Sequence, residues 1–587
     1  MNEDAHRQED GRHDRGGPSR GSGGPRRSEQ RRDPGGRHRD EQGRGNRARA
    51  DRGRLDAPGD ERVRGSGTGA DRGRSDAPGD ERRDIRGRQR GAARVEGRTG
   101  RTASAPSRRR REGDPARTAA YDVLRAVDGS DAYANLVLPP MLRERGIRGR
   151  DAGFATELAY GALRLRGRYD AVVEQAAGRP LDRIDPPVRD VLRLGVHQLL
   201  AMRVPPHAAV SETVALARQT VGSGAAQFVN AVLRAVADVP ADAWVQRVGD
   251  AADPDGTDPV ARLAAVHSHP AWVVRALREA LVGAGRPAGE VAALLEADNA
   301  APRVTLAARP GLVEPTELLA EVTDDRRSGA AGHVAPTAVV LDGGDPAALA
   351  SVREGRAGVQ DEGSQLVALA LAAAPLDGPD VRWLDLCAGP GGKAALLAAT
   401  AAQRGGRLVA NEVQPHRARL VEQALRAVPP AAVEAVRTGD GTLLGDEEPA
   451  GYDRVMVDAP CTGLGALRRR PESRWRRTPA DLATLGTLQR ALLGSALRAV
   501  RPGGVVAYVT CSPHLAETRL VVTDALRAAR KAGLEVEPVD ATAVVRGLRP
   551  DRSDSEPDDG EHHTDVQLWP HVDGTDAMHL TLLRRLA

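Results

Sequence analysis

Apolar side chains recur every three or four residues along residues 114–240, which is the spacing of one helix face. The pattern occurs in four stretches: Phe154, Leu158 and Ala162; Val188, Val191, Leu192 and Leu199; Val210, Val214 and Val221; and Val229, Val232, Leu233 and Val236. Pro186 and Pro187 suit the first turn of the second helix, and Pro205-Pro206 is expected to end it. The pattern therefore predicts a separate all-α domain.

The hydrophobic pattern changes twice after residue 240. Residues 241–300 are polar at first and then helical from His269 onward. Residues 301–375 include two short strand-like runs, at 303–306 and 339–341. We interpret residues 241–375 as linking helices followed by a small α+β subdomain, and we expect that subdomain to bind RNA.

From about residue 376 the chain alternates between short apolar runs and amphipathic stretches. Strands are predicted at 381–386, 407–411, 433–437, 454–458 and 505–510, and helices around 415–427 and 481–500. Alternation of strand and helix is typical of a doubly wound, Rossmann-like α/β domain with a parallel sheet. We expect this domain to span residues 376–587. Within it, residues 547–566 are acidic and predicted to form a disordered loop, and His562-His563 there lacks a carboxylate frame for a metal.

Residues 1–113 have almost no aliphatic or aromatic side chains, which predicts a disordered tail. They contain an internal repeat, because residues 50–62 recur at 70–82, but no hydrophobic position repeats with them. The tail carries 31 Arg against 20 Asp and Glu, so its net charge is +11, whereas the remainder of the chain carries −7. Such a tail suits loose contact with RNA, or it acts only to keep the chain soluble.

The composition indicates the cellular compartment and limits the kinds of site that the chain can contain. The three cysteines, at 387, 461 and 511, have neither the close pairing of a disulfide framework nor the spacing of a zinc site. No apolar run is long enough to cross a membrane, and the start of the chain has no hydrophobic signal segment. We therefore expect a cytoplasmic protein with reduced thiols, no metal and no membrane contact.

A glycine-rich loop follows the first strand of the α/β domain. It comprises Cys387, Ala388, Gly389, Pro390, Gly391, Gly392 and Lys393. Its backbone N–H groups and the helix that follows are expected to face a cofactor. The loop is not a phosphate-binding P-loop, because Cys387 stands in place of the leading glycine and Ala394 in place of the Mg²⁺-binding Ser or Thr. Kinase and ATPase chemistry are therefore excluded.

Acids follow the next two predicted strands. Glu412, about 20 residues after the loop, is placed to bind ribose hydroxyls, and Asp440 to bind an adenine amino group. Either acid alone is more often a cap at a strand end. As an ordered series behind one glycine loop, they favour S-adenosylmethionine as the cofactor.

Cys461 and Cys511 stand at the ends of two strands, where parallel sheets bind ligands. Buried cysteine usually behaves as a small hydrophobic residue, and that interpretation suits Cys387. A thiolate of lowered pKa at a strand end is instead a nucleophile. Its addition to C6 of cytosine would make C5 reactive toward a methyl donor, while Asp458 could hold the N3/N4 edge of a base flipped out of its stack.

Residues 385–393, 458–461 and 510–512 resemble the Sun/Fmu-type RNA cytosine-C5 methyltransferases. Residues 156–164, 192–200 and 228–234 resemble the NusB-like RNA-binding domain, which points to the RsmB-like branch. The resemblance implies methylation of cytosine C5 in 16S ribosomal RNA by a monomer. It implies that Cys511 is the nucleophile, that Cys461 assists product release, and that residues 387–393 with Glu412, Asp440 and Asp458 line the methyl-donor site.

This chain departs from the family pattern at three places. Gly389 stands where alanine is commoner and is expected to be harmless, and Glu412 replaces a frequent aspartate. Residues 574–579 lack the usual aromatic pair. The basic stretch 468–477, with Trp475 as its aromatic, is expected to contact RNA, unless it is only a solvated face. The alternatives to the main hypothesis are a tRNA cytosine-C5 methyltransferase and a non-catalytic RNA-binding or assembly factor.

Overall fold

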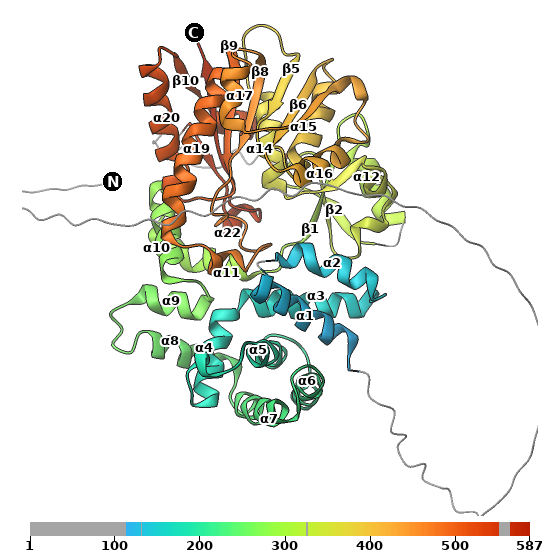
Figure 1. The fold of residues 1–587 in the computed structure, drawn as a ribbon, viewed down its shortest axis with the longest axis vertical. Helices are drawn as coiled ribbons and strands as arrows, with labels where there is room; N and C mark the ends of the chain where they lie inside the picture. The colour runs from blue at the N-terminus through green and yellow to red at the C-terminus, as the bar shows by residue number, and fades with distance from the viewer. Residues whose placement is uncertain (1–112, 131, 325–326, 551–563, 587) are drawn as a thin grey trace, which may run out of the picture. The chain divides into compact units, whose positions relative to one another are not determined.

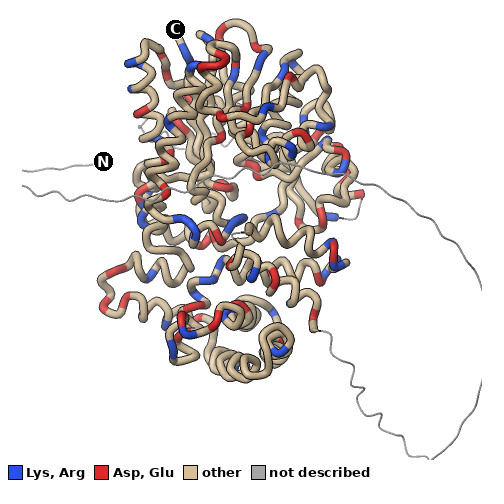
Figure 2. The backbone as a smooth tube through the Cα atoms, in the orientation of Figure 1, with Lys and Arg blue, Asp and Glu red and all other residues tan. Residues whose placement is uncertain are grey.

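A computed structural model describes residues 113–130, 132–324, 327–550 and 564–586. The described residues all belong to one compact unit of the chain. The predicted Arg-rich tail, apart from Gly113, lies outside the described residues, as does most of the predicted acidic loop with His562-His563. Within the described residues no helix is long and apolar enough to cross a membrane. Acidic and basic residues are interspersed along the described chain (Figure 2).

The N-terminal part of this unit is a helical bundle, as predicted (Figure 1). Its helices are α1 (Pro115–Ser130), α2 (Ala134–Glu144), α3 (Gly149–Arg164), α4 (Arg166–Ala177), α5 (Pro186–Leu200), α6 (Pro206–Thr220) and α7 (Ser223–Ala237). Pro186 opens α5 as expected, but α5 ends at Leu200 and Pro206 opens α6. The expectation that Pro205-Pro206 ends a helix is therefore wrong, because proline lacks the N–H that the first helical turn leaves unpaired.

Four further helices connect the bundle to the next sheet. They are α8 (Ala241–Ala252), α9 (Pro259–His267), α10 (Ala271–Gly283) and α11 (Val291–Asn299). Helical structure thus begins well before His269. Trp244 and Val248 of α8 pack against the core of the bundle, and this contact with distant residues stabilises a helix whose own sequence is polar.

The predicted α+β subdomain follows the linking helices. Strands β1 (Val304–Ala308), β2 (Gly329–Ala331), β3 (Ala338–Leu341) and β4 (Ala357–Val359) form an antiparallel sheet in the order β2-β3-β1-β4. Helices α12 (Pro315–Asp324) and α13 (Ala350–Glu354) complete it, and Leu318 and Val322 of α12 pack into its core. The boundaries predicted at residues 113, 240 and 375 stay predictions.

The C-terminal part is built on a second sheet, in the order β10-β12-β9-β8-β5-β6-β7. Its strands are β5 (Arg382–Asp385), β6 (Arg407–Glu412), β7 (Val433–Thr438), β8 (Tyr452–Asp458), β9 (Val500–Thr510), β10 (Val536–Val539) and β12 (His579–Arg585), with β11 (Val566–Gln567) paired to β12. The five strands predicted from the sequence are present and parallel. The sheet is not wholly parallel, however, because β12 returns between β9 and β10 and runs antiparallel to both.

Helices cover both faces of this sheet (Figure 1). One face packs against α14 (Glu362–Ala373), α15 (Gly392–Ala402), α16 (Pro415–Leu425) and α21 (Ala541–Leu548), and the other against α17 (Gly441–Glu447), α19 (Pro479–Ala499) and α20 (Arg519–Lys531). Both faces therefore bury apolar side chains, which explains the continuous apolar runs of the central strands. Polar groups of the chain collect at the carboxyl ends of β5, β6, β8 and β9.

Candidate functional site

The glycine loop lies between the end of β5 and the start of α15, as predicted. Gly391 caps α15 with a φ of +109°, and a Cβ there would lie 2.6 Å from the side chain of Ala424. At Gly389 the space is limited by a side chain instead, since a Cβ would lie 2.3 Å from Oε2 of Glu412. The left-handed turn therefore requires glycine at 391, whereas the space at 389 depends on the acid at 412.

The two acids expected near the cofactor lie in different environments. Glu412 is buried at the end of β6, and its carboxylate accepts hydrogen bonds from the backbone N–H of Gly389 and of Gln414, each 3.0 Å long. Arg417 lies 3.5 Å from the same carboxylate. Asp440 is exposed and caps α17, where it accepts from the backbone N–H of Thr442 at 2.9 Å. The capping interpretation therefore holds for Asp440 in this structure.

A charged group links the loop to the strand that carries Asp458. Lys393 Nζ lies 2.9 Å from Asp458 Oδ2 and 3.4 Å from Ser364 Oγ. Burial lowers the pKa of Lys393, but the charge of Asp458 and the hydrogen bond to it outweigh burial, so the pKa lies above its usual value. Lys393 therefore remains a cation beside the carboxyl end of the sheet.

Asp385, at the end of β5, is a buried acid whose carboxylate accepts no hydrogen bond from a neighbouring strand. Neither of its carboxylate oxygens has a hydrogen-bonding partner of ordinary geometry among the described residues. Burial, followed by the negative charge of Asp458, raises its pKa to about 7. Such a group is a candidate for contact with a ligand, because a buried polar atom is rarely left unpaired.

The two cysteines predicted to act together do meet. Cys461 follows β8 and Cys511 follows β9, and these strands are neighbours in the sheet. Their sulfur atoms lie 3.3 Å apart, and both side chains are partly exposed. The backbone N–H of Gly465 donates to the carbonyl of Cys511 at 2.8 Å, which fixes the segment after Cys461 against the other thiol.

The two thiols differ in their electrostatic surroundings. The hydrogen bond from Cys461 lowers the pKa of Cys511; burial and Asp458 oppose this shift, and Lys393 favours it. The same hydrogen bond, followed by burial, raises the pKa of Cys461 well above its usual range. The pKa of Cys511 is therefore shifted down and that of Cys461 is shifted up. Burial also raises the pKa of Cys387, which packs against the apolar core as expected of an inert thiol.

Sequence reasoning missed the residues that hold these two loops together. Glu517, fully buried, accepts hydrogen bonds from Thr462, the residue after Cys461. Gln489 of α19 donates to the carbonyl of Pro460 at 2.8 Å. A lone glutamate six residues after Cys511 and a glutamine in a helix carry no distinctive signal in one sequence.

The expected RNA contact of residues 468–477 is wrong for its buried members. Arg474 is fully buried and donates to the carbonyls of Arg164 and Ser268. Arg468 is buried against Asp576. Trp475 packs so closely on α4 that a Cβ on Gly167 would lie 2.5 Å from its ring, so this ring is not free to stack on a base.

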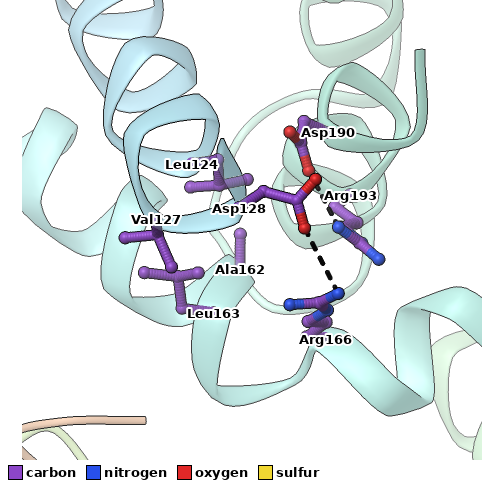
Figure 3. A pocket seen from close by; sticks show the side chains of 8 residues that line it. All are labelled: Leu124, Val127, Asp128, Ala162, Leu163, Arg166, Asp190 and Arg193. Carbon is purple, nitrogen blue, oxygen red and sulfur yellow. Dashed lines mark hydrogen bonds and ion pairs between the residues drawn. The ribbon is translucent and has the colours of Figure 1, made fainter. Parts of the chain in front are cut away.

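A shallow depression of about 220 Å³ lies in the helical bundle, away from the thiols (Figure 3). Its charged side chains pair with one another: Arg193 lies 2.8 Å from Asp190, and Arg166 lies 3.5 Å from Asp128. These pairs stabilise the bundle and leave no free group for chemistry. Among the described residues no cluster of His, Cys, Asp and Glu could hold a metal ion.

Comparison with known proteins adds the family. A model described as 16S rRNA methyltransferase RsmB/F matches residues 370–584, and a NusB family model matches residues 114–238. A Mycobacterium tuberculosis protein named as a methyltransferase is 53% identical over 478 residues, which cover 81% of this chain and 98% of the relative.

Two further likenesses agree with this. The ribosomal RNA small subunit methyltransferase B of Pseudomonas syringae pv. tomato is 32% identical over 399 residues, covering 68% of this chain and 83% of the relative. A crystal structure described as that of PH0851 shares the fold, with a TM-score of 0.63 and 20% identity over 80% of this chain and 98% of that chain. The chain therefore belongs to the RsmB/F family of ribosomal RNA methyltransferases, with a NusB-family domain at its N-terminal side.

Proposed function

We propose that the protein transfers a methyl group from S-adenosylmethionine to C5 of a cytosine in 16S ribosomal RNA, through a covalent adduct of Cys511. The observation that carries the proposal is the pair of sulfur atoms, 3.3 Å apart, at the ends of β8 and β9. One sulfur is biased toward the thiolate and the other toward the thiol, and a cation and a carboxylate lie beside them. A simple packing role for both cysteines would not require that asymmetry.

The residues at the glycine loop suit S-adenosylmethionine. The buried carboxylate of Asp385 at the start of the loop would accommodate a cationic group of the cofactor. Residues 387–393 with Glu412, Asp440 and Asp458 would hold the cofactor. When bound, S-adenosylmethionine supplies an electrophilic methyl group on its sulfonium.

The chain's own residues supply the remaining chemistry. The Cys511 thiolate forms a bond to C6 of the cytosine, which turns C5 into a nucleophilic, enamine-like carbon. Asp458 holds the N3/N4 edge of the ring, and its contact with Lys393 keeps the side chain oriented. After C5 is methylated, a base removes the C5 proton and the bond from Cys511 to C6 breaks, a release that Cys461 assists from contact distance.

The substrate fits the rest of the chain. The NusB-family domain packs within the same unit as the catalytic sheet, and Arg470 of the segment after Cys461 is exposed. Exposed arginine near the reacting base is suited to contact with RNA phosphates. The proposed partner is small-subunit ribosomal RNA. Methylation of tRNA instead would mean that the substrate is tRNA.

The direct test compares the full chain with its Cys511→Ala variant in a strain that lacks the gene. Bisulfite sequencing of total RNA should reveal one cytosine in 16S ribosomal RNA that is methylated only when the wild-type chain is present. Cys511→Ala should abolish that methylation while the folded variant still binds S-adenosylmethionine. Methylation confined to tRNA, or full activity of the variant, would contradict the proposal.

A further inference from the structure

Glu517 is a buried acid that the proposed chemistry does not use. It ends the short 3-10 turn Leu515–Glu517, which follows the loop of Cys511, and its side chain is 0% exposed. Its backbone is also held in place, because the Tyr508 hydroxyl of β9 donates a hydrogen bond to the Glu517 carbonyl at 2.7 Å. Burial of a carboxylate is unfavourable unless several donors compensate it, so its environment is informative.

The carboxylate of Glu517 joins the two thiol loops. Oε1 accepts from the backbone N–H of Thr462 at 2.8 Å, and Oε2 accepts from the Thr462 hydroxyl. The same hydroxyl lies 3.1 Å from Oγ of Ser512. Thr462 follows Cys461 and Ser512 follows Cys511, so one chain of hydrogen bonds fixes both cysteines relative to each other.

A third donor extends this arrangement to a helix. Gln489 of α19 donates to Oε1 of Glu517 at 3.2 Å and also to the carbonyl of Pro460, directly before Cys461. Gln489 is itself fully buried. The loop of Cys461 is therefore held on both sides of the cysteine, at Pro460 and at Thr462, by two buried residues that contact each other.

The donors to Glu517 are a backbone amide, a hydroxyl and a side-chain amide, and each of them is neutral. None of these hydrogen-bond donors therefore brings a positive charge to the carboxylate on the Cys461 side of the pair. The charged groups that face the two thiols are Lys393 from α15, Asp458 from β8, Arg470 from the segment after Cys461, and Glu517. Lys393 and Arg470 favour the thiolate at Cys511, and Glu517 disfavours a thiolate at Cys461.

We propose that Glu517 is a positioning residue that keeps the two sulfurs in contact and keeps Cys461 protonated beside the Cys511 thiolate. The inference rests on the proposed two-thiol chemistry. The hydrogen bond to Cys511, then burial, and then the charges of Cys511 and Glu517 raise the pKa of Cys461. Without Glu517 one of the causes that disfavour a thiolate at Cys461 is lost, so the difference between the pKa values of the two thiols becomes smaller.

The test measures thiol reactivity in the full chain without RNA. Iodoacetamide alkylation across pH, mapped by peptide mass spectrometry, should give a lower midpoint for Cys511 than for Cys461. In Glu517→Gln the pH midpoint for alkylation of Cys461 should fall. The difference between the midpoints of the two cysteines should therefore decrease by about one pH unit or more. Methyl transfer should fall by about tenfold or more through kcat, with the KM for RNA unchanged. The exposed Glu535→Gln should match the wild type in both measurements.

The variant Glu517→Asp distinguishes the effect of the charge from the effect of side-chain length. It also provides the test if Glu517→Gln does not fold. It keeps the negative charge, so the wild-type gap between midpoints should remain, but its shorter reach should still lower kcat. An unchanged gap in Glu517→Gln, or wild-type kcat in either variant, overturns the inference. If the wild type methylates no cytosine, the proposed function is wrong. The difference between the alkylation midpoints of Cys461 and Cys511 still tests the role of Glu517 in that case.

Discussion

At the scale of single residues, the site is defined by the different surroundings of two chemically identical groups. Lys393 lies beside Asp458 on the side of Cys511, whereas Glu517 lies behind Cys461. A sulfur–sulfur contact of 3.3 Å makes the two ionisations exclusive, because two thiolates at that distance would repel strongly. The unequal roles of the cysteines in the proposed mechanism therefore follow from neighbours rather than from the cysteines themselves.

Two departures from the family pattern, at positions 389 and 412, are related to each other in the structure. Gly389 stands where alanine is commoner, and Glu412 stands where aspartate is frequent. In the structure the longer acid reaches the backbone N–H of Gly389 at 3.0 Å and occupies the space that a Cβ would need. The missing methyl group and the additional methylene therefore compensate each other.

This compensation predicts non-additive effects on cofactor binding. Gly389→Ala should weaken S-adenosylmethionine binding by about tenfold, because the new Cβ displaces the Glu412 carboxylate. Adding Glu412→Asp should restore most of that loss, because the shorter side chain frees the space. Isothermal titration calorimetry on both single variants and the double variant measures the coupling. Purely additive losses would show that the two positions are independent.

The candidate residues were predictable where the residue type was rare. Three cysteines and two lysines in a chain of 587 residues stand out, and the contacts of Cys461, Cys511 and Lys393 agree with the sequence prediction. Glu517 could not be found in the same way, because glutamate is common and its partner Thr462 lies 55 positions away. The assigned cofactor and catalytic roles stay predictions.

At the scale of elements, the RNA contact predicted for residues 468–477 is wrong for the buried members because their partners are distant in sequence. The arginines of this segment suggested a nucleic-acid surface, but Arg474 is a buried connector between helices. It donates to Asn299 Oδ1 at 2.9 Å and to backbone carbonyls more than 200 positions away. Charge alone does not distinguish an arginine that binds phosphate from one that satisfies buried carbonyls.

Beside Arg474 lies a buried pair of titratable groups, and this pair predicts a pH effect on stability. His269 Nε2 and Asp298 Oδ2 are 3.6 Å apart. Burial raises the pKa of Asp298 to about 7, against the opposing charge of Arg474. An unfolded aspartate has a pKa of about 4, so between about pH 4 and 7 the unfolded state loses a proton that the folded state retains. Asp298 therefore destabilises the fold increasingly as pH rises through this window.

The variant Asp298→Asn removes that titration and keeps the shape of the side chain. Its melting temperature relative to the wild type should rise from pH 4 to pH 7 and then level off. Differential scanning fluorimetry across this range measures the difference, and the exposed Asp182→Asn is the matched control. A difference that is constant with pH would mean that folding does not raise the pKa of Asp298.

At the scale of the whole molecule, the described residues form one compact unit in which the bundle and the catalytic sheet share buried polar contacts. Glu472 accepts from the backbone N–H of Ala134 at 3.0 Å, and Arg476 donates to the carbonyl of Ala132 at 2.7 Å. Periodicity predicted the fold class of each segment correctly. It could not predict this docking or the antiparallel β12, because both depend on contacts between segments far apart in the chain.

These contacts predict cooperative unfolding. Separation of the bundle would break the hydrogen bonds from Arg474 to the Arg164 carbonyl and from the Ala134 N–H to Glu472, and hydrogen bonds to charged groups each contribute about 1.5–3 kcal/mol. The bundle and the catalytic sheet should therefore unfold in one calorimetric transition. Two transitions separated by more than about 10 °C would show that the parts are energetically independent.

In the proposed mechanism Cys511 attacks the base and Cys461 allows its release. The most direct measurement is a denaturing gel of the Cys461→Ala variant after incubation with its RNA and S-adenosylmethionine. We expect a slowly migrating protein–RNA species, absent from Cys511→Ala, from Cys387→Ala and from the double variant Cys461→Ala/Cys511→Ala. A folded Cys461→Ala variant that turns over without accumulating this species, or a species that persists without Cys511, would contradict the two-thiol mechanism.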